Sequence, residues 1–143
     1  MLRIGKLTDY AMMILSGLAK TPDVVQSAST LAESLLLPAT TVSKILKMLG
    51  DAALVSSVRG AEGGYRLQKP ASAISVASVI AIMEGDIAMT ECCENIALCG
   101  LQTNCGMKDN WIKINGVVHA LLSKISLQDM MHPLSLQERL HDE

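Results

Sequence analysis

The sequence contains no phenylalanine, and only one tryptophan and two tyrosines occur among its 143 residues. Since half of the residues are apolar, including nine methionines, the core must be aliphatic. No apolar run approaches the roughly 20 residues of a membrane-spanning helix, and the N-terminus lacks the apolar stretch of a secretory signal. We therefore expect a cytoplasmic protein without a membrane partner, long enough for one domain and one attached element.

Cysteine is absent from all but one short stretch, which contains Cys92, Cys93, Cys99 and Cys105. In a reducing compartment, clustered thiols are more often metal ligands or redox groups than disulfides. The stretch lacks the close cysteine pairs of zinc sites and thiol oxidoreductases. Five residues separate Cys93 from Cys99 and Cys99 from Cys105. Such wide gaps in a glycine-containing loop suit a group larger than one ion, and an iron–sulfur cluster takes thiolate ligands. Free oxidisable thiols and a structural zinc are the alternatives.

Positive charge is missing around these cysteines, because no lysine or arginine lies between Lys69 and Lys108. No cation is therefore at hand to activate a thiol, which argues against a reactive-thiol enzyme. Residues 1–70 have eight Lys/Arg against five Asp/Glu, whereas residues 71–143 have four against nine. The N-terminal half is thus the one suited to face nucleic-acid phosphates.

Three helices are expected in this basic half. Apolar spacing predicts the first over about 8–19, and Thr30 with Glu33 predicts a capping box that begins a second helix, ending at Pro38. The third, about 39–50, has two distinct faces. Its apolar stripe consists of Val42, Ile45, Leu46 and Leu49, and its polar stripe of Thr40, Ser43, Lys44 and Lys47.

Two β-prone runs follow, "LVSSV" and "GYRLQ", separated by the glycine-rich turn "RGAEGG". The order helix, turn, helix, hairpin predicts a winged helix-turn-helix, which places its third helix in the major groove. An arginine on a thin wing suits the minor groove. Our candidates are Thr40, Thr41, Ser43 and Lys44 for base edges, with Lys47, Arg59 and Tyr65 for phosphates or the groove. A winged-helix scaffold that binds no DNA is the alternative.

Two more helices are expected in the acidic half. "ISVASVIAIMEG" predicts a fourth helix that stops at Gly85, and a long helix begins at about 107. Its apolar residues Trp111, Ile114, Val118, Leu121 and Ile125 have coiled-coil spacing, which favours a dimerisation helix over one packed on its own domain. The expected divisions are a DNA-binding domain (1–84), a cysteine loop (85–106), a dimerisation helix (107–130) and a tail (131–143).

The motifs together resemble those of the Rrf-type family of winged-helix transcription regulators. "KLTDYA", "TVSKILKML", "SVRGAEGGYRL", "ISVASVI" and a C-x5-C-x5-C loop follow the family's order over about residues 1–130. The branch of the family that regulates the SUF genes of iron–sulfur assembly is the most similar to this chain in the segments "LTDYA", "MTEC", "NWIKIN" and "ISLQDM". The nitric-oxide-sensing repressor of the same family is the next most similar. The resemblance implies a mainly α, dimeric fold that senses through an iron–sulfur cluster.

The resemblance also implies which residues hold that cluster, of the 2Fe-2S or 4Fe-4S type. Cys93, Cys99 and Cys105 match the family's ligand spacing, and Cys92 is an alternative to Cys93. The histidine that completes the set in the ISC-branch regulator is replaced here by Lys108. The nitric-oxide repressor instead uses an aspartate from the partner subunit, and Asp9 fits that place, although it equally suits the helix dipole.

We therefore expect a homodimeric regulator, a repressor of iron–sulfur assembly genes, that binds double-stranded operator DNA. A nitric-oxide or redox-sensing repressor of the same family is the first alternative. A thiol or iron–sulfur redox protein without DNA affinity is the alternative from another class. One departure from the family is Ala53, where relatives commonly have glycine before the first wing strand.

Overall fold

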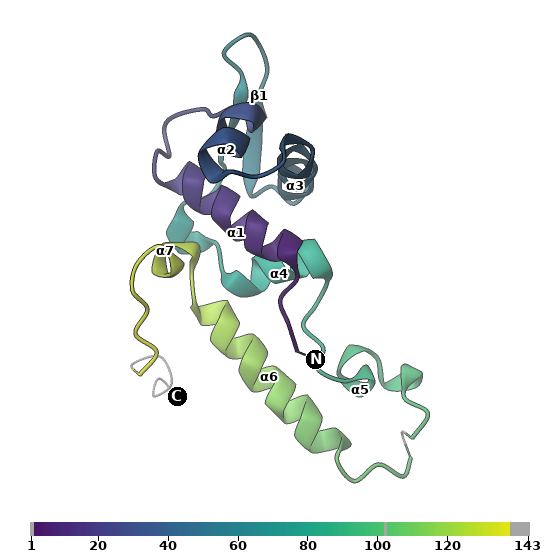
Figure 1. Cartoon of the computed structure of the whole chain (residues 1–143). Coiled ribbons are helices and arrows are strands. Elements are labelled where there is room, and N and C mark those ends of the chain that lie inside the picture. The colour runs from purple at the N-terminus through teal and green to yellow at the C-terminus, as the bar shows by residue number, and fades with distance from the viewer. Residues whose placement is uncertain (1, 102, 138–143) are drawn as a thin grey trace.

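A computed structural model describes residues 2–101 and 103–137. Its main elements are α1 (Lys6–Ala19), α2 (Ala28–Leu35), α3 (Ala39–Asp51), β1 (Val55–Val58), β2 (Gly64–Leu67), α4 (Val76–Glu84) and α6 (Lys108–Lys124). Figure 1 shows α1, α2, α3 and the hairpin as one body, with α4 beneath it. The helix α6 extends away from this body, and the cysteine-containing segment lies at its far end. The mainly helical winged fold expected from the sequence is confirmed.

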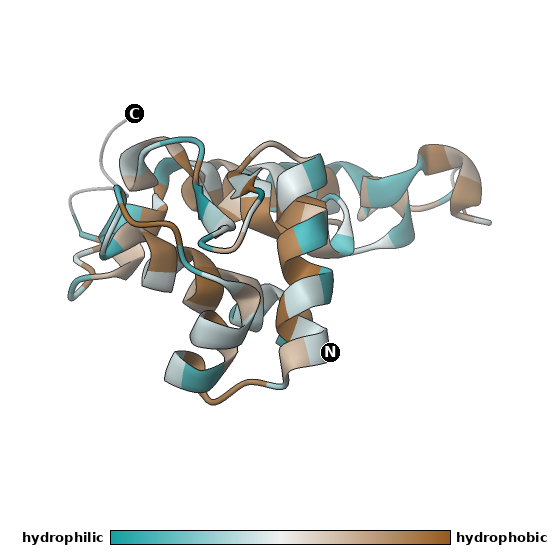
Figure 2. Cartoon of the chain, turned by 90° about the horizontal axis from the view of Figure 1, so that it is seen from above, coloured by the Kyte–Doolittle hydropathy of each residue, from teal (hydrophilic) through white to brown (hydrophobic). Residues whose placement is uncertain are grey.

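The core of this body is aliphatic, as the absence of phenylalanine requires. From α1, Ile14 and Leu15 are 0% exposed. They meet the predicted apolar stripe of α3, and hydropathic colouring shows the apolar sides of these helices turned inward (Figure 2). Each fully buried leucine or isoleucine contributes about 1.5–3 kcal/mol to folding. All four residues of the α3 stripe are 0% exposed: Val42, Ile45, Leu46 and Leu49.

The predicted start of the second helix is wrong. Its N-cap is Ser27, whose hydroxyl accepts a hydrogen bond from the amide of Thr30 at 3.1 Å, so Thr30 lies inside the helix. The reason is tertiary: the neighbouring Gln26 pairs with Tyr65 and keeps the chain extended up to Ser27. Serine caps a helix at least as well as threonine. The helix ends at Leu35, one turn before Pro38, with Leu36 left-handed at φ 56°.

The wing is a two-stranded antiparallel hairpin in which Val55 is opposite Leu67 and Val58 is opposite Gly64. The segment before α2 pairs with β2 through an isolated antiparallel β-bridge between Gln26 and Tyr65. In it the Gln26 N–H donates to the Tyr65 carbonyl at 2.9 Å, and the Tyr65 N–H donates to the Gln26 carbonyl at 2.7 Å. Gly64 permits this close approach, because a Cβ there would lie 2.4 Å from the Gln26 carbonyl oxygen. The wing is thereby fixed to the helix-turn-helix.

The predicted fourth helix and its stop are confirmed. The Ser75 hydroxyl caps α4, and Gly85 ends it with φ 92°. A backbone clamp then ties the start of α4 to the end of α6. In it the Val76 N–H donates to the Ile125 carbonyl at 2.9 Å, and the Leu127 N–H donates to the Ile74 carbonyl at 2.7 Å. Residue 127 begins the short helix α7 (Leu127–Met130), which packs beside α1 (Figure 1).

The long helix α6 spans 17 residues, none of which is buried. Val118 and Leu121 of the predicted seam are half-buried, whereas Trp111 is 40% and Ile114 45% exposed. Ile125 lies just beyond the helix, in the clamp, and is 5% exposed. Within the described residues, no helix combines the length and apolarity needed to cross a membrane.

Candidate nucleic-acid interface and cysteine loop

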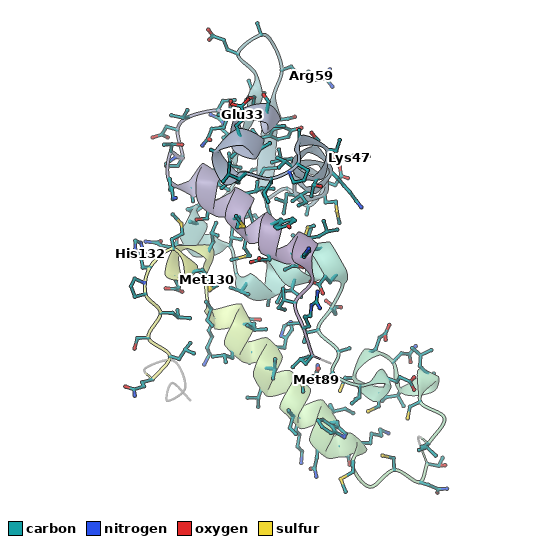
Figure 3. The ribbon with its side chains drawn as sticks, in the orientation of Figure 1. Glu33, Lys47, Arg59, Met89, Met130 and His132 are labelled. Carbon is teal, nitrogen blue, oxygen red and sulfur yellow. The ribbon has the colours of Figure 1, made fainter. Side chains whose placement is uncertain are left out.

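The helix α3 presents hydroxyl and ammonium groups on the side opposite its buried stripe. Thr40, Ser43, Lys44 and Lys47 are exposed, and Thr41 is half-buried. Lys47 extends outward from the helix (Figure 3). Such a face offers hydrogen-bond donors and positive charge to an anionic surface.

The wing carries the other predicted contacts at the same end of the molecule (Figures 1 and 3). Arg59 immediately follows β1 and is exposed. Tyr65 is half-buried because its side chain packs against the core, so only part of it is accessible to a ligand. The exposed face of α3 and Arg59 thus lie at one end of the molecule.

The cysteine loop contains two short helical turns, α5 (Glu91–Glu94) and η2 (Ile96–Leu98). All four thiols are free; Cys93, Cys99 and Cys105 are half-buried, and Cys92 is 8% exposed. The Thr90 hydroxyl lies 3.0 Å from Cys92 Sγ and 3.2 Å from Cys93 Sγ. These two thiols are therefore held close to one polar group at the start of the loop.

The donor chemistry fits an iron–sulfur cluster, because free thiols are the ligands that such clusters require. Over residues 2–101 and 103–137, however, no three Cys, His, Asp or Glu side chains lie together as a metal site needs. After η2 the loop is open at two glycines: a Cβ added at Gly100 or Gly106 would meet no neighbouring atom.

Asp9 is exposed in the first turn of α1. It lines a cavity of about 370 Å³ together with Arg3 and Lys6, and no cysteine lines that cavity. Within one chain, then, Asp9 has two cationic neighbours at this cavity rather than thiols. Lys108, at the position of the missing histidine ligand, begins α6.

Asn115 of α6 is a site residue that sequence reasoning missed. Its side-chain amide donates to the Ile87 carbonyl at 2.9 Å, and its side-chain oxygen accepts from the Met89 N–H at 2.9 Å. Asn115 also lines a cleft of about 400 Å³ beside Cys92 and Cys93. The available signal was a polar residue at helical spacing between the apolar Trp111 and Val118.

Comparison with known proteins agrees with this geometry. Residues 4–133 match the family model Rrf2, described as an iron-dependent transcriptional regulator. The HTH-type transcriptional regulator NsrR of Bacillus subtilis is 27% identical over 132 residues, which cover 91% of this chain and 90% of the relative.

Two solved structures share the fold. CymR, described as the global cysteine regulator of B. subtilis, is 29% identical with a TM-score of 0.73, over 92% of this chain and 97% of CymR. IscR of T. potens is 26% identical with a TM-score of 0.70, over 91% of this chain and 86% of IscR. The family match extends from α1 through the wing and the cysteine loop to α7, and its members regulate transcription rather than catalyse reactions. The chain therefore belongs to the Rrf2 family and is a DNA-binding transcriptional regulator, not an enzyme.

Proposed function

We propose that this regulator is a homodimeric repressor of iron–sulfur cluster assembly genes, whose affinity for double-stranded operator DNA depends on an iron–sulfur cluster. One observation carries the proposal: the chain that presents an exposed polar face on α3 also has all four of its cysteines as free thiols in one loop. As a regulator of transcription it would act in the cytoplasm.

Burial supports Cys93, Cys99 and Cys105 as the residues that would hold the cluster. These three are half-buried, whereas Cys92 is only 8% exposed, as expected of a packed thiol. When bound, the cluster would supply an oxygen- and redox-sensitive inorganic centre, of the 2Fe-2S or 4Fe-4S type. Asp9 of a partner subunit remains our candidate for the fourth ligand, since its carboxylate is exposed.

A homodimer is supported by the exposed apolar side chains of α6. Trp111, Ile114 and Val117 are 40%, 45% and 67% exposed. Large apolar side chains that gather on one helix are typical of an interface. A second copy of the helix would remove them from water, and a two-fold protein suits a two-fold operator.

On DNA, we assign Thr40, Thr41, Ser43 and Lys44 to the major groove and Lys47, Arg59 and Tyr65 to phosphates or the minor groove. The free end of the hairpin and the exposed face of α3 support this division. The cluster can control DNA binding only if it binds more tightly to one arrangement of the DNA-binding domain than to another.

The description of the family as iron-dependent supports the cofactor, whereas CymR is described as a cysteine regulator. Membership alone therefore does not identify the signal. The test is DNA binding by protein purified without oxygen, at the promoter of cluster-assembly genes, before and after iron is removed with a chelator. We expect affinity to change on iron removal, and an unchanged affinity contradicts the proposal.

A nitric-oxide or redox-sensing repressor is the second candidate, favoured by the exposed Asp9 on α1. The two candidates differ in what releases the DNA. Nitric oxide added to DNA-bound protein releases it under the second candidate, whereas iron limitation relieves repression under the first.

A further inference from the structure

We propose that Asn115 is the positioning residue of the cysteine loop: its carboxamide fixes the arm that leads to Cys92 and Cys93 against α6. The arm consists of residues 87–91, between the end of α4 and the loop's thiols. In Figure 3, Met89 of this arm lies between α6 and α5.

The two hydrogen bonds of Asn115 use both polar groups of its carboxamide. The carbonyl of Ile87 and the N–H of Met89, both 2.9 Å from the carboxamide, lie two residues apart and face the same side. A primary amide carries a donor and an acceptor side by side and satisfies both. Aspartate lacks the donor, and leucine lacks both groups. Asparagine is therefore specifically suited to this position.

The fixed arm determines where the first thiols lie. One residue beyond Met89, the Thr90 hydroxyl lies 3.0 Å from Cys92 Sγ and 3.2 Å from Cys93 Sγ. Asn115, Ile112 and both cysteines line the same cleft of about 400 Å³. The path from the carboxamide to the thiols is thus short and continuous, and it keeps Cys92 at 8% exposure while Cys93 stays accessible.

The effect of Asn115 on thiol exposure holds for the cluster-free protein. Its effect on a cluster rests on the proposed function. With the arm fixed, a cluster would form by approach of Cys99 and Cys105 to Cys93 rather than by movement of Cys93. Loss of the carboxamide would release the arm and expose Cys92.

The experiment measures alkylation of each cysteine by iodoacetamide in reduced, cluster-free protein, followed by mass spectrometry. The variants are Asn115→Ala and Asn115→Asp, with Asn110→Ala as the control, because Asn110 is an exposed asparagine of the same helix. We expect Cys92 to react about tenfold faster in both Asn115 variants, as loss of one to two hydrogen bonds implies, and at the wild-type rate in Asn110→Ala. The rate at Cys105 stays the same throughout.

An unchanged rate at Cys92 in both Asn115 variants, with helix content intact by circular dichroism, overturns the proposal. Hydrogen exchange in the wild-type protein tests it without any variant. The amide of Met89 should exchange more slowly than that of Ala88, and equal exchange rates contradict the proposed role of the hydrogen bond from Met89 to Asn115. After anaerobic reconstitution with iron and sulfide, Asn115→Ala should lose visible absorption faster than the control. If wild-type protein takes up no cluster, the proposed function fails, while the alkylation rates still decide the role of Asn115.

Discussion

The hydroxyl of Thr8 in α1 donates a hydrogen bond to the carboxylate of Glu84, the last residue of α4. The same carboxylate oxygen accepts from the Gly5 N–H at 2.7 Å. Thr8 is only 1% exposed, whereas Glu84 is exposed and directly precedes Gly85, where the chain turns toward the cysteines. This contact joins the start of the cysteine-containing segment to the helix that forms the centre of the DNA-binding core.

Thr8→Val should lower the free energy of unfolding by about 1 kcal/mol, because a buried donor to a carboxylate is lost while shape is kept. Urea denaturation measures the change. Thr40→Val is the control, since Thr40 is exposed and its substitution should change stability by less than about 0.5 kcal/mol. Equal stability of Thr8→Val and the wild type means that the contact contributes nothing to folding.

Lys44→Ala should weaken operator binding about tenfold and reduce the slope of log affinity against log salt by about 1, as expected when one ionic contact to DNA is lost. Lys113→Ala, which removes an exposed lysine from α6, should leave both quantities unchanged. Titrations of labelled DNA at several salt concentrations provide the measurement. A wild-type slope in Lys44→Ala removes Lys44 from the interface.

Ala53→Gly should raise the free energy of unfolding by about 1 kcal/mol. Ala53 has φ 59°, a left-handed conformation that costs an L-residue about 1–2 kcal/mol and that glycine adopts freely. Its neighbour Ala52 has φ −87°, so Ala52→Gly should instead lower stability by about 0.5–1 kcal/mol. Opposite signs in thermal denaturation support the account, and two losses contradict it.

Ile114→Glu should convert the proposed homodimer to a monomer, because a charge placed in a dimer interface must be desolvated. Sedimentation velocity measures the oligomeric state. Lys113→Glu changes the neighbouring, exposed residue and should remain dimeric. A dimeric Ile114→Glu variant places the interface elsewhere.

The sequence was informative where structure follows local periodicity. The apolar stripe of α3 identified its buried face, and the glycines after Arg59 identified the wing turn, because both depend on nearby residues. The cap at Ser27 was missed because it depends on the pairing of Gln26 with Tyr65, 39 positions away along the chain. The hydrogen bonds of Asn115 were missed for a similar reason, since its partners lie 26 and 28 residues earlier in the sequence.

For the candidate site, residue types were predictable and their arrangement was not. Spacing singled out Cys93, Cys99 and Cys105 but did not distinguish Cys92 from Cys93. Burial, which arises from the packing of α5 beside α6, gives a reason to choose Cys93. The ligand set stays a prediction, and so does the assignment of DNA contacts.

The most direct test of the central claim combines metal analysis with DNA binding on protein kept free of oxygen throughout. Wild-type protein should contain iron and acid-labile sulfide, and its operator affinity should differ from that of Cys99→Ser, which should lack both and show no visible absorption. Oxygen-free wild-type protein that contains neither iron nor sulfide, yet binds the operator with the same affinity as Cys99→Ser, would contradict the account.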